Sequence, residues 1–308
     1  MNTRQMLGKV LIPRSADVAD RMTDVLIALI PAAAAGCVYF GYNAVLLLFV
    51  CPAAAAATEW LLSRLLRIPC QMRDLSAVVT GLLVALGQSP HMPVWAAALC
   101  TALSVAVGRM FFGGSGCEIV SPAALGIVLS RLSFPTHSST FSEAFSHTET
   151  MFFPLNSSDG VYTLKQLLFG AHSGAIGEVG SLFLLMGALY LLVRRVISIT
   201  VPAAMTIGAT VAALICSADL AVTLLGGGLL LGAVFIATDY TLLPRNVSGQ
   251  LAYGAVCGVL TVLIRRFGGA DEGVYFAILL INLLHPLFSA IPDFNFLLPT
   301  KGELRNET

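Results

Sequence analysis

The chain has 308 residues, of which 57% are hydrophobic and 11% are charged, and its formal net charge is zero. Because a soluble domain carries about 25% charged residues, the few charges here cannot coat soluble domains of this total length, and the balanced charge gives no support for nucleic-acid binding. The composition predicts an integral membrane protein.

The first 22 residues are polar and basic, and they lack the apolar core and small-residue cleavage site of a secretory signal peptide. We expect residues 1–22 to be a cytoplasmic N-terminal segment. A membrane-spanning helix needs about 20 apolar residues, and ten segments approach that criterion. They are 23–40, 43–62, 74–87, 93–112, 118–132, 178–194, 198–217, 219–238, 250–267 and 272–290. The short segments 74–87 and 118–132 indicate tilted, broken or partly re-entrant helices.

The placement of Lys and Arg predicts the orientation of these segments. If the N-terminus is cytoplasmic, all but four of the 17 Lys and Arg residues fall on the cytoplasmic side, and the four exceptions are Arg131, Lys165, Arg265 and Arg266. Cytoplasmic loops carry the excess of positive charge. We therefore expect both termini, including the tail 291–308, to be cytoplasmic and the polar loop 133–177 to face outward.

The two groups of segments resemble each other. Segment 93–112 leads into Gly113-Gly114 and the acidic Glu118, and segment 250–267 leads into Gly268-Gly269 and then acidic residues before the next segment. Five spans per group place the second group upside down relative to the first. The pattern predicts an all-α membrane protein of about ten transmembrane helices, in two inverted five-helix repeats at 23–132 and 178–290.

The stretch "GGGLLLGAVFIATD" at 226–239 is interpreted as part of the eighth span. Glycine is a poor helix former in water, but in lipid it is tolerated and allows helices to approach closely. Asp239 then falls at the cytoplasmic end of the span, where water and headgroups can solvate its charge.

Three acidic residues stand at the ends of apolar segments: Asp74, Glu118 and Asp239. One interpretation is that they cap helices and are solvated at the membrane interface. The other is that they line a cation route, because charges within a membrane are costly and are usually functional. The sequence leaves both open.

The remaining reactive side chains give no sign of a metal site or of hydrolytic chemistry. The five histidines have no metal-ligand spacing, and the seven cysteines are scattered through apolar runs, where a thiol packs as a small hydrophobe. No nucleophile elbow, Walker loop or dinucleotide fingerprint is present.

Several stretches resemble a known family: "MRDLSAVVTGLLVAL", "GGSGCEIVSPAALG", "GAIGEVGSLFLLMGALYLL", "GGLLLGAVFIATD" and "YGAVCGVLTVLIRRFGGADEGVYFAILLINLLHPL". In this order they are similar to the D subunit of the Rnf ion-translocating electron-transport complex. That subunit is related to the B subunit of the sodium-pumping NADH:quinone reductase. The resemblance covers most of residues 20–290 and implies the same two inverted repeats.

The resemblance also implies an FMN, attached through a phosphoester to the threonine of an outer Asp-Gly-x-Ser-Gly-Ala-Thr motif. This chain has "SSDGVYTLKQLL" at 157–168, in which Asp159 and Gly160 match the start but the Ser-Gly-Ala step is missing. Thr163 is the candidate attachment residue. Alternatively, Thr163 caps the helix that follows, or covalent attachment has been lost. A second flavin is compatible with the resemblance.

The resemblance implies a subunit of an oxidoreductase that transfers electrons between ferredoxin and NAD and moves Na⁺ or H⁺ across a prokaryotic cell (inner) membrane. Its expected partners are other membrane and peripheral subunits that carry iron–sulfur clusters and flavins, and the chain alone is not expected to be catalytic. The alternatives are a cofactor-free channel or transporter for a small solute, and a structural scaffold that kept the fold and lost the flavin.

Overall fold

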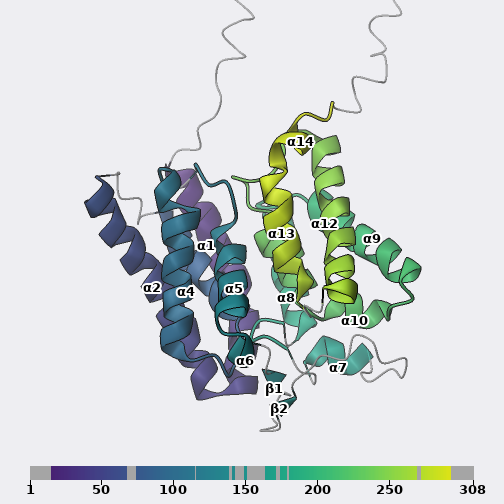
Figure 1. Cartoon of the computed structure of the whole chain (residues 1–308), viewed down its shortest axis with the longest axis horizontal. Coiled ribbons are helices and arrows are strands. Elements are labelled where there is room, and N and C mark those ends of the chain that lie inside the picture. Colours follow the sequence, from purple (N-terminus) through teal and green to yellow (C-terminus); the bar gives the residue numbers. More distant parts are fainter. Residues whose placement is uncertain are drawn as a thin grey trace, which may run out of the picture.

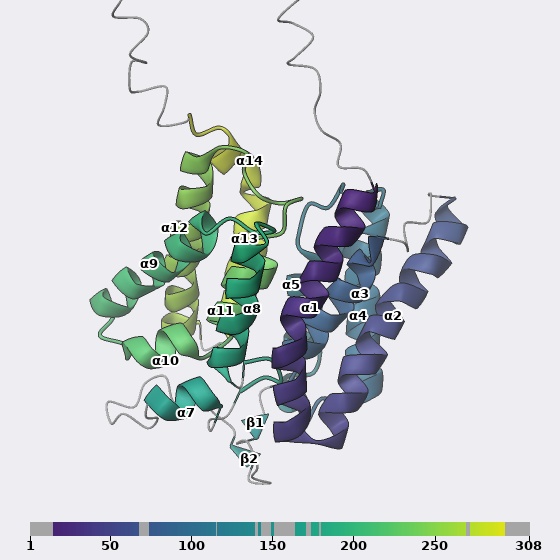
Figure 2. The ribbon, with the colours of Figure 1, turned by 180° about the vertical axis from the view of Figure 1, so that it is seen from behind.

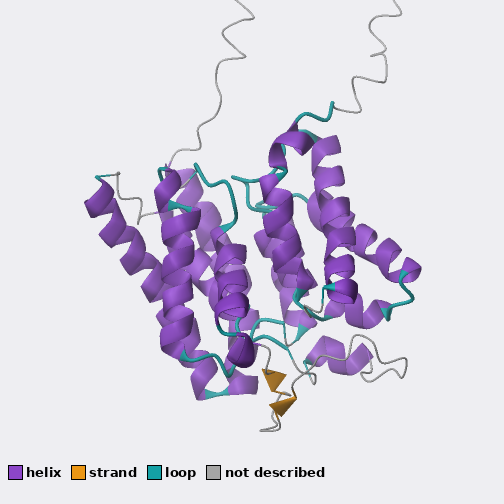
Figure 3. Cartoon of the chain, in the orientation of Figure 1, coloured by secondary structure: helices purple, strands orange, loops and turns teal. Residues whose placement is uncertain are grey.

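The protein is a bundle of helices (Figures 1 and 3). The computed structural model describes residues 15–67, 74–114, 116–138, 141–142, 149–150, 164–170, 174–178, 180–268 and 272–292. In these ranges, strand is limited to one antiparallel pair, β1 (Phe141–Ser142) and β2 (Glu149–Thr150). The predicted all-α class is confirmed at this level.

Five helical elements form the first part of the bundle. They are α1 (Ser15–Phe40), α2 (Tyr42–Leu66), α3 (Ser76–Leu86), α4 (Val94–Gly108) with the 3₁₀ turn η3 (Met110–Phe112), and α5 (Pro122–Ser133). Gly41, with φ 68°, makes the tight turn between α1 and α2. The short helix α6 (Pro135–Ser138) follows α5, and α7 (Leu164–Phe169) lies further along the chain.

The second part of the bundle is less regular than the sequence predicts. It contains α8 (Ser181–Val193), α9 (Thr200–Ile215), α10 (Leu220–Leu225), α11 (Leu229–Leu231), the π-helical turn η4 (Gly232–Ile236), α12 (Val247–Phe267), α13 (Gly273–Leu283) and α14 (His285–Ser289). The predicted single span 219–238 is wrong, because the chain leaves the helix at Gly226–Gly228. The predicted span 272–290 is also divided, at Leu284.

The helices pack as two groups. Within the first, α2 contacts α3 and α4, and α4 contacts α5; within the second, α12 packs against α9 and α13. The contact of α9 with α12 needs glycine, since a Cβ at Gly258 would collide with the carbonyl oxygen of Met205. The groups meet where α1 contacts α8 and α5 contacts α13. We call the groups α1–α5 and α8–α14 the first and second halves.

The outer surface of the bundle is apolar. Among the described residues, four helical stretches are long and apolar enough to cross a membrane: Val18–Phe40, Tyr42–Leu66, Val94–Phe112 and Val247–Phe267. On α2, Leu47 and Cys51 are fully buried while Phe49 is 73% exposed. Large apolar side chains on the outer face suit contact with lipid rather than water. The chain is therefore a membrane protein, as its composition predicts.

The two ends of the bundle are distinct. In the views of Figures 1 and 2, α1 begins and α14 lies at the upper end, whereas α6, the strand pair and α7 lie at the lower end. We call these the α14 end and the α7 end. The described parts of the loop 133–177 thus lie at the end opposite the first described residues of α1.

Candidate functional site

A pocket lies between the two halves near the α14 end. Helices α1, α3 and α5 line it from the first half, and η4 with the segment after α8 lines it from the second. Val79, Leu83 and Phe235 supply apolar wall, while Arg109 and Asp239 supply charge. A mostly apolar pocket with a few convergent polar groups is typical of a small-molecule or cofactor site.

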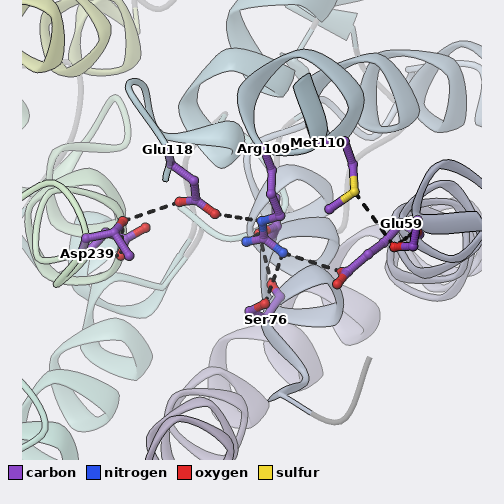
Figure 4. A network of polar contacts seen from close by, with 9 residues as sticks. Glu59, Ser76, Arg109, Met110, Glu118 and Asp239 are labelled. Atoms are coloured by element: carbon purple, nitrogen blue, oxygen red, sulfur yellow. Dashed lines mark hydrogen bonds and ion pairs between the residues drawn. The ribbon is translucent and has the colours of Figure 1, made fainter. Parts of the chain in front are cut away.

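Arg109 is the centre of the polar wall (Figure 4). It follows α4 directly and is 4% exposed. Its Nε–H donates to Glu118 Oε1 at 2.6 Å, and its terminal nitrogens donate to the hydroxyls of Ser76 at 3.0 Å and Thr80 at 3.1 Å. The guanidinium therefore ties the short helix α3 to the turn that precedes α5.

Glu59 approaches the same guanidinium from α2. It is 1% exposed, and its Oε2 lies 3.6 Å from Arg109 Nη1 as an ion pair, but neither carboxylate oxygen makes a hydrogen bond in the described structure. Figure 4 shows Glu59 and Glu118 on opposite sides of Arg109. One cation is thus shared between two buried carboxylates.

Thr241 joins this first-half cluster to the second half. Its hydroxyl contacts Glu118 Oε2 at 3.3 Å and Asp239 Oδ1 at 3.0 Å, and its backbone N–H donates to the same Asp239 oxygen at 3.2 Å. Asp239 and Thr241 follow η4, whereas Glu118 precedes α5. The structure therefore brings together two of the three predicted acids, 121 residues apart in sequence, from different halves.

The capping interpretation is wrong for Asp74 and Glu118. Helix α3 begins after Leu75, with no side-chain cap, and α5 is capped by the hydroxyl of Ser121. Asp74 and Glu118 are 7% and 9% exposed, so interface solvation does not account for them either. Asp239 is half-buried on the pocket wall, and its solvation at the membrane interface stays a prediction.

The charge balance of this cluster favours cations. The charges of Glu59, Glu118 and Asp239 act on Arg109, and Asp74 is close enough for its charge to act on Glu59. Glu118 lies in the turn outside both neighbouring helices, and burial raises its pKa to about 7, although Arg109 acts in the opposite direction. The described residues contain no group of three His, Cys, Asp or Glu side chains arranged to hold a metal ion. The chemistry that fits is exchange of a proton or of a weakly held monovalent cation.

A second buried charge cluster lies at the α7 end. Arg131, at the end of α5, pairs with Glu272, just before α13, and Arg265, in the last turn of α12, is also buried. Glu178 accepts a hydrogen bond from the backbone N–H of Ala175 at 3.4 Å and feels the charges of both arginines. Two arginines and two carboxylates balance here, unlike the acidic cluster around Arg109.

The structure does not test the predicted flavin residues. Asp159, Gly160 and Thr163 lie outside the described residues, and the first described residue after them is Leu164, which begins α7. Their role as an attachment site stays a prediction.

Sequence reasoning missed Glu59, Arg109 and Arg265 as site residues. The distribution of Lys and Arg assigned Arg109 and Arg265 to the two surfaces of the membrane, whereas the structure buries both side chains. Glu59 had a readable signal, since it is an acid inside the apolar run 43–62. The two arginines also had a recognisable sequence pattern, because each precedes a Gly-Gly pair and then an acidic residue.

The fold and the cluster together define a helical membrane protein with a buried, acidic polar centre where its two halves meet. The chain belongs to the NQR2, RnfD, RnfE family, whose model matches residues 7–293. This confirms the resemblance to the D subunits of Rnf complexes.

Named relatives come from several bacteria, and each is the D subunit of an oxidoreductase complex. The chain is 35% identical to that of the Na⁺-translocating ferredoxin:NAD⁺ oxidoreductase complex of Acetobacterium woodii, over 87% of each chain. It is 31% identical to that of the proton-translocating ferredoxin:NAD⁺ oxidoreductase complex of Clostridium ljungdahlii, over 88% of each. It is 33% identical to that of the ion-translocating oxidoreductase complex of Stutzerimonas stutzeri, over 88% of this chain and 89% of that one.

Proposed function

We propose that this chain is the D subunit of an ion-translocating ferredoxin:NAD⁺ oxidoreductase complex, a multi-pass subunit of a prokaryotic cell (inner) membrane that is not catalytic alone. The similarity along nearly the whole length of three named D subunits supports this assignment. The chain would work with the iron–sulfur and flavin-carrying subunits of such a complex. It contributes the membrane part and the ion-coupling groups.

The observation that best supports the ion-coupling role is the cluster around Arg109. Acids from both halves meet there, with Asp239 and Arg109 on the pocket wall, and ionisable groups buried within a membrane protein mark ion or proton paths. Glu118 and Asp239, bridged by Thr241, form the core of the proposed route, and Asp74 lies beside it. The coupling ion is Na⁺ or H⁺, since relatives named for each are similar to this chain.

The inverted-repeat arrangement is part of this proposal. Each half has a buried arginine at the end of its fourth helical span, Arg109 and Arg265, and a buried acid just before the fifth, Glu118 and Glu272. Helix α4, which Arg109 follows, ends at the α14 end, whereas α12, with Arg265 in its last turn, ends at the α7 end, as an inverted repeat requires. The α14 end would be cytoplasmic and the α7 end would face outward.

The proposal includes a flavin at each end. Thr163 would hold FMN by a phosphoester at the α7 end. The pocket near the α14 end suits a second flavin in character, with apolar walls for a flat ring and Thr80 and Arg109 as hydrogen-bonding groups for its polar edge. A bound flavin supplies the electron chemistry, and the protein supplies its placement and electrostatics.

The test is intact-mass measurement of the subunit co-expressed with its own flavin transferase. We expect the wild type to carry an added FMN mass and fluorescence in a denaturing gel, and we expect both to vanish in Thr163→Val. Thr150→Val, a change of the same kind in β2, serves as the control and should keep the mass. An unmodified wild type that also contains no extractable flavin would favour the cofactor-free channel or the scaffold.

A further inference from the structure

The chain breaks its helix at three consecutive glycines. Helix α10 ends at Leu225, Gly227 and Gly228 take φ values of 60° and 72°, and α11 begins at Leu229. The last carbonyl groups of a helix have no partner within it. The break therefore presents backbone oxygens at the α7 end of the bundle that must find a donor or a cation.

Arg265 is the donor that these backbone oxygens contact. From the last turn of α12, its Nη1 donates to the carbonyl oxygen of Thr223 at 2.9 Å, and its Nη2 contacts those of Gly226 at 3.3 Å and Gly227 at 2.5 Å. The side chain is 7% exposed. One guanidinium thus contacts three carbonyl oxygens, one in the last turn of α10 and two in the break.

The break is held in this shape from its other side. A Cβ at Gly228 would collide with Glu178 Oε1 and would lie 2.6 Å from the hydroxyl of Tyr275, so no larger residue fits without movement. Glu178 and the ion pair of Arg131 with Glu272 complete the surroundings, so that carboxyl groups lie near both positive charges.

Backbone oxygens at unwound helices are the groups with which membrane transporters coordinate small cations. In this protein the same kind of cage contains a tethered guanidinium. We propose that Arg265 occupies a monovalent-cation site formed by the break at 226–228, and thereby closes the α7 end of the subunit to free Na⁺ and H⁺. The role rests on the proposed place of the chain in an ion-translocating membrane complex.

The test is passive ion leak through the whole complex reconstituted in sealed vesicles, without electron donor or acceptor. Arg265→Gln keeps hydrogen-bond donors but removes the charge, and we expect it to raise the uptake of radioactive Na⁺, or the decay of a pH gradient, about tenfold. Arg266→Gln removes the neighbouring charge on the same helix and should leave the leak at the wild-type level. Arg265→Lys restores a positive charge and should be as tight as the wild type.

A second measurement distinguishes a cation site from a contact that only holds helices together. If the emptied cage accepts Na⁺, the apparent melting temperature of Arg265→Gln in detergent rises with NaCl relative to choline chloride, and that of the wild type does not. Equal leak in Arg265→Gln and wild type overturns the proposal. Equal leak in the Lys and Gln variants also overturns it, because it would indicate a distorted structure rather than a lost charge. Failure of both variants to accumulate overturns it too, because Arg265 would then be needed for folding.

The outcome is independent of the electron-transfer assignment. Passive leak requires neither ferredoxin nor NAD⁺, so a tight Arg265→Gln complex would refute the occupied site and leave the proposed function untouched. Absence of flavin from the wild-type subunit would refute the proposed function and would not affect the leak measurement.

Discussion

Arg109 is the residue on which the polar centre depends. Its guanidinium pairs with Glu118 at 2.6 Å and Glu59 at 3.6 Å, and all three side chains are buried. A buried ion pair is weak evidence for stability by itself, because removing charges from water is costly. Removing only the cation is different, since it leaves carboxylates buried without a counter-charge. The three side chains therefore act as one group.

The first prediction concerns that removal. Arg109→Leu should destabilise the protein by about 3–5 kcal/mol, the usual cost of breaking a buried ion pair from one side. The measurement is thermal or detergent-induced unfolding of the purified subunit. Arg245→Leu, at an exposed position, is the control and should have a far smaller effect. Similar losses in the two variants would show that Arg109 is not the counter-charge of this centre.

The second prediction follows from Glu118. Its folded pKa is raised from 4.5 to about 7 by burial, so the protonated carboxyl is favoured in the folded state. Its contribution to stability is complete below pH 4.5 and is lost as the pH rises to about 7, by roughly 3 kcal/mol at about 1.4 kcal/mol per pKa unit. Melting temperatures across this window should fall more steeply in wild type than in Glu118→Gln. Parallel curves would contradict the assignment.

At the scale of elements, the sequence predicts the long helices well. Helices α2, α4 and α12 fall within a few residues of predicted spans, because long apolar runs in a membrane have little choice but to form helices. The break at 226–228 was not predicted. Glycine is tolerated within membrane helices, so three glycines do not by themselves show where a helix stops. What stops it is Arg265, about 40 residues later, together with Glu178 and Tyr275.

The third prediction tests this explanation of the break. Gly228→Ala and Gly113→Ala both place a side chain at positive φ with ψ near zero (φ 72°, ψ 8° and φ 112°, ψ 7°), which costs about 1–2 kcal/mol. Only at Gly228 would the new Cβ also collide with Glu178 and Tyr275, whereas the nearest atoms at Gly113, those of Cys117, lie at an ordinary 3.9 Å. Gly228→Ala should therefore lower the melting temperature clearly more than Gly113→Ala. Equal effects would mean that backbone strain alone explains the glycine.

The candidate site was only partly predictable. Glu118 and Asp239 are acids at the ends of apolar segments, so the cost of burying charge points to them directly. Their contact through Thr241 depends on how the two halves pack, which no local pattern specifies. Arg109 and Arg265 were assigned to surfaces, because the rule for positive charges counts residues by loop and does not detect an arginine that turns inward.

At the scale of the whole molecule, the two clusters differ in charge. The α14 end has an acidic cluster beside a pocket, and the α7 end has a balanced cluster closed by Arg265. This difference gives the bundle a direction, with an accessible acidic centre at one end only of the part that the structure describes. The proposed orientation places that centre on the cytoplasmic side, where ferredoxin and NAD⁺ would react with partner subunits.

The fourth prediction concerns this orientation. On a background without the seven native cysteines, Lys165→Cys in the exposed face of α7 should react with an impermeant maleimide in cells with a permeabilised outer envelope. Arg245→Cys, between η4 and α12, should react only after lysis. The reverse pattern would invert the topology.

The measurement that tests the central claim most directly is the number of ions moved per NADH formed by the reconstituted complex, compared between wild type and Asp239→Asn. Asp239 is half-buried on the pocket wall, and asparagine keeps a side-chain oxygen that can accept from Thr241, so its neutralisation should leave assembly unchanged. The account predicts that Asp239→Asn lowers ion movement per electron, or slows both together, in a complex that accumulates normally. An unchanged ratio at an unchanged rate, or a subunit that fails to accumulate, would contradict a coupling role for this centre.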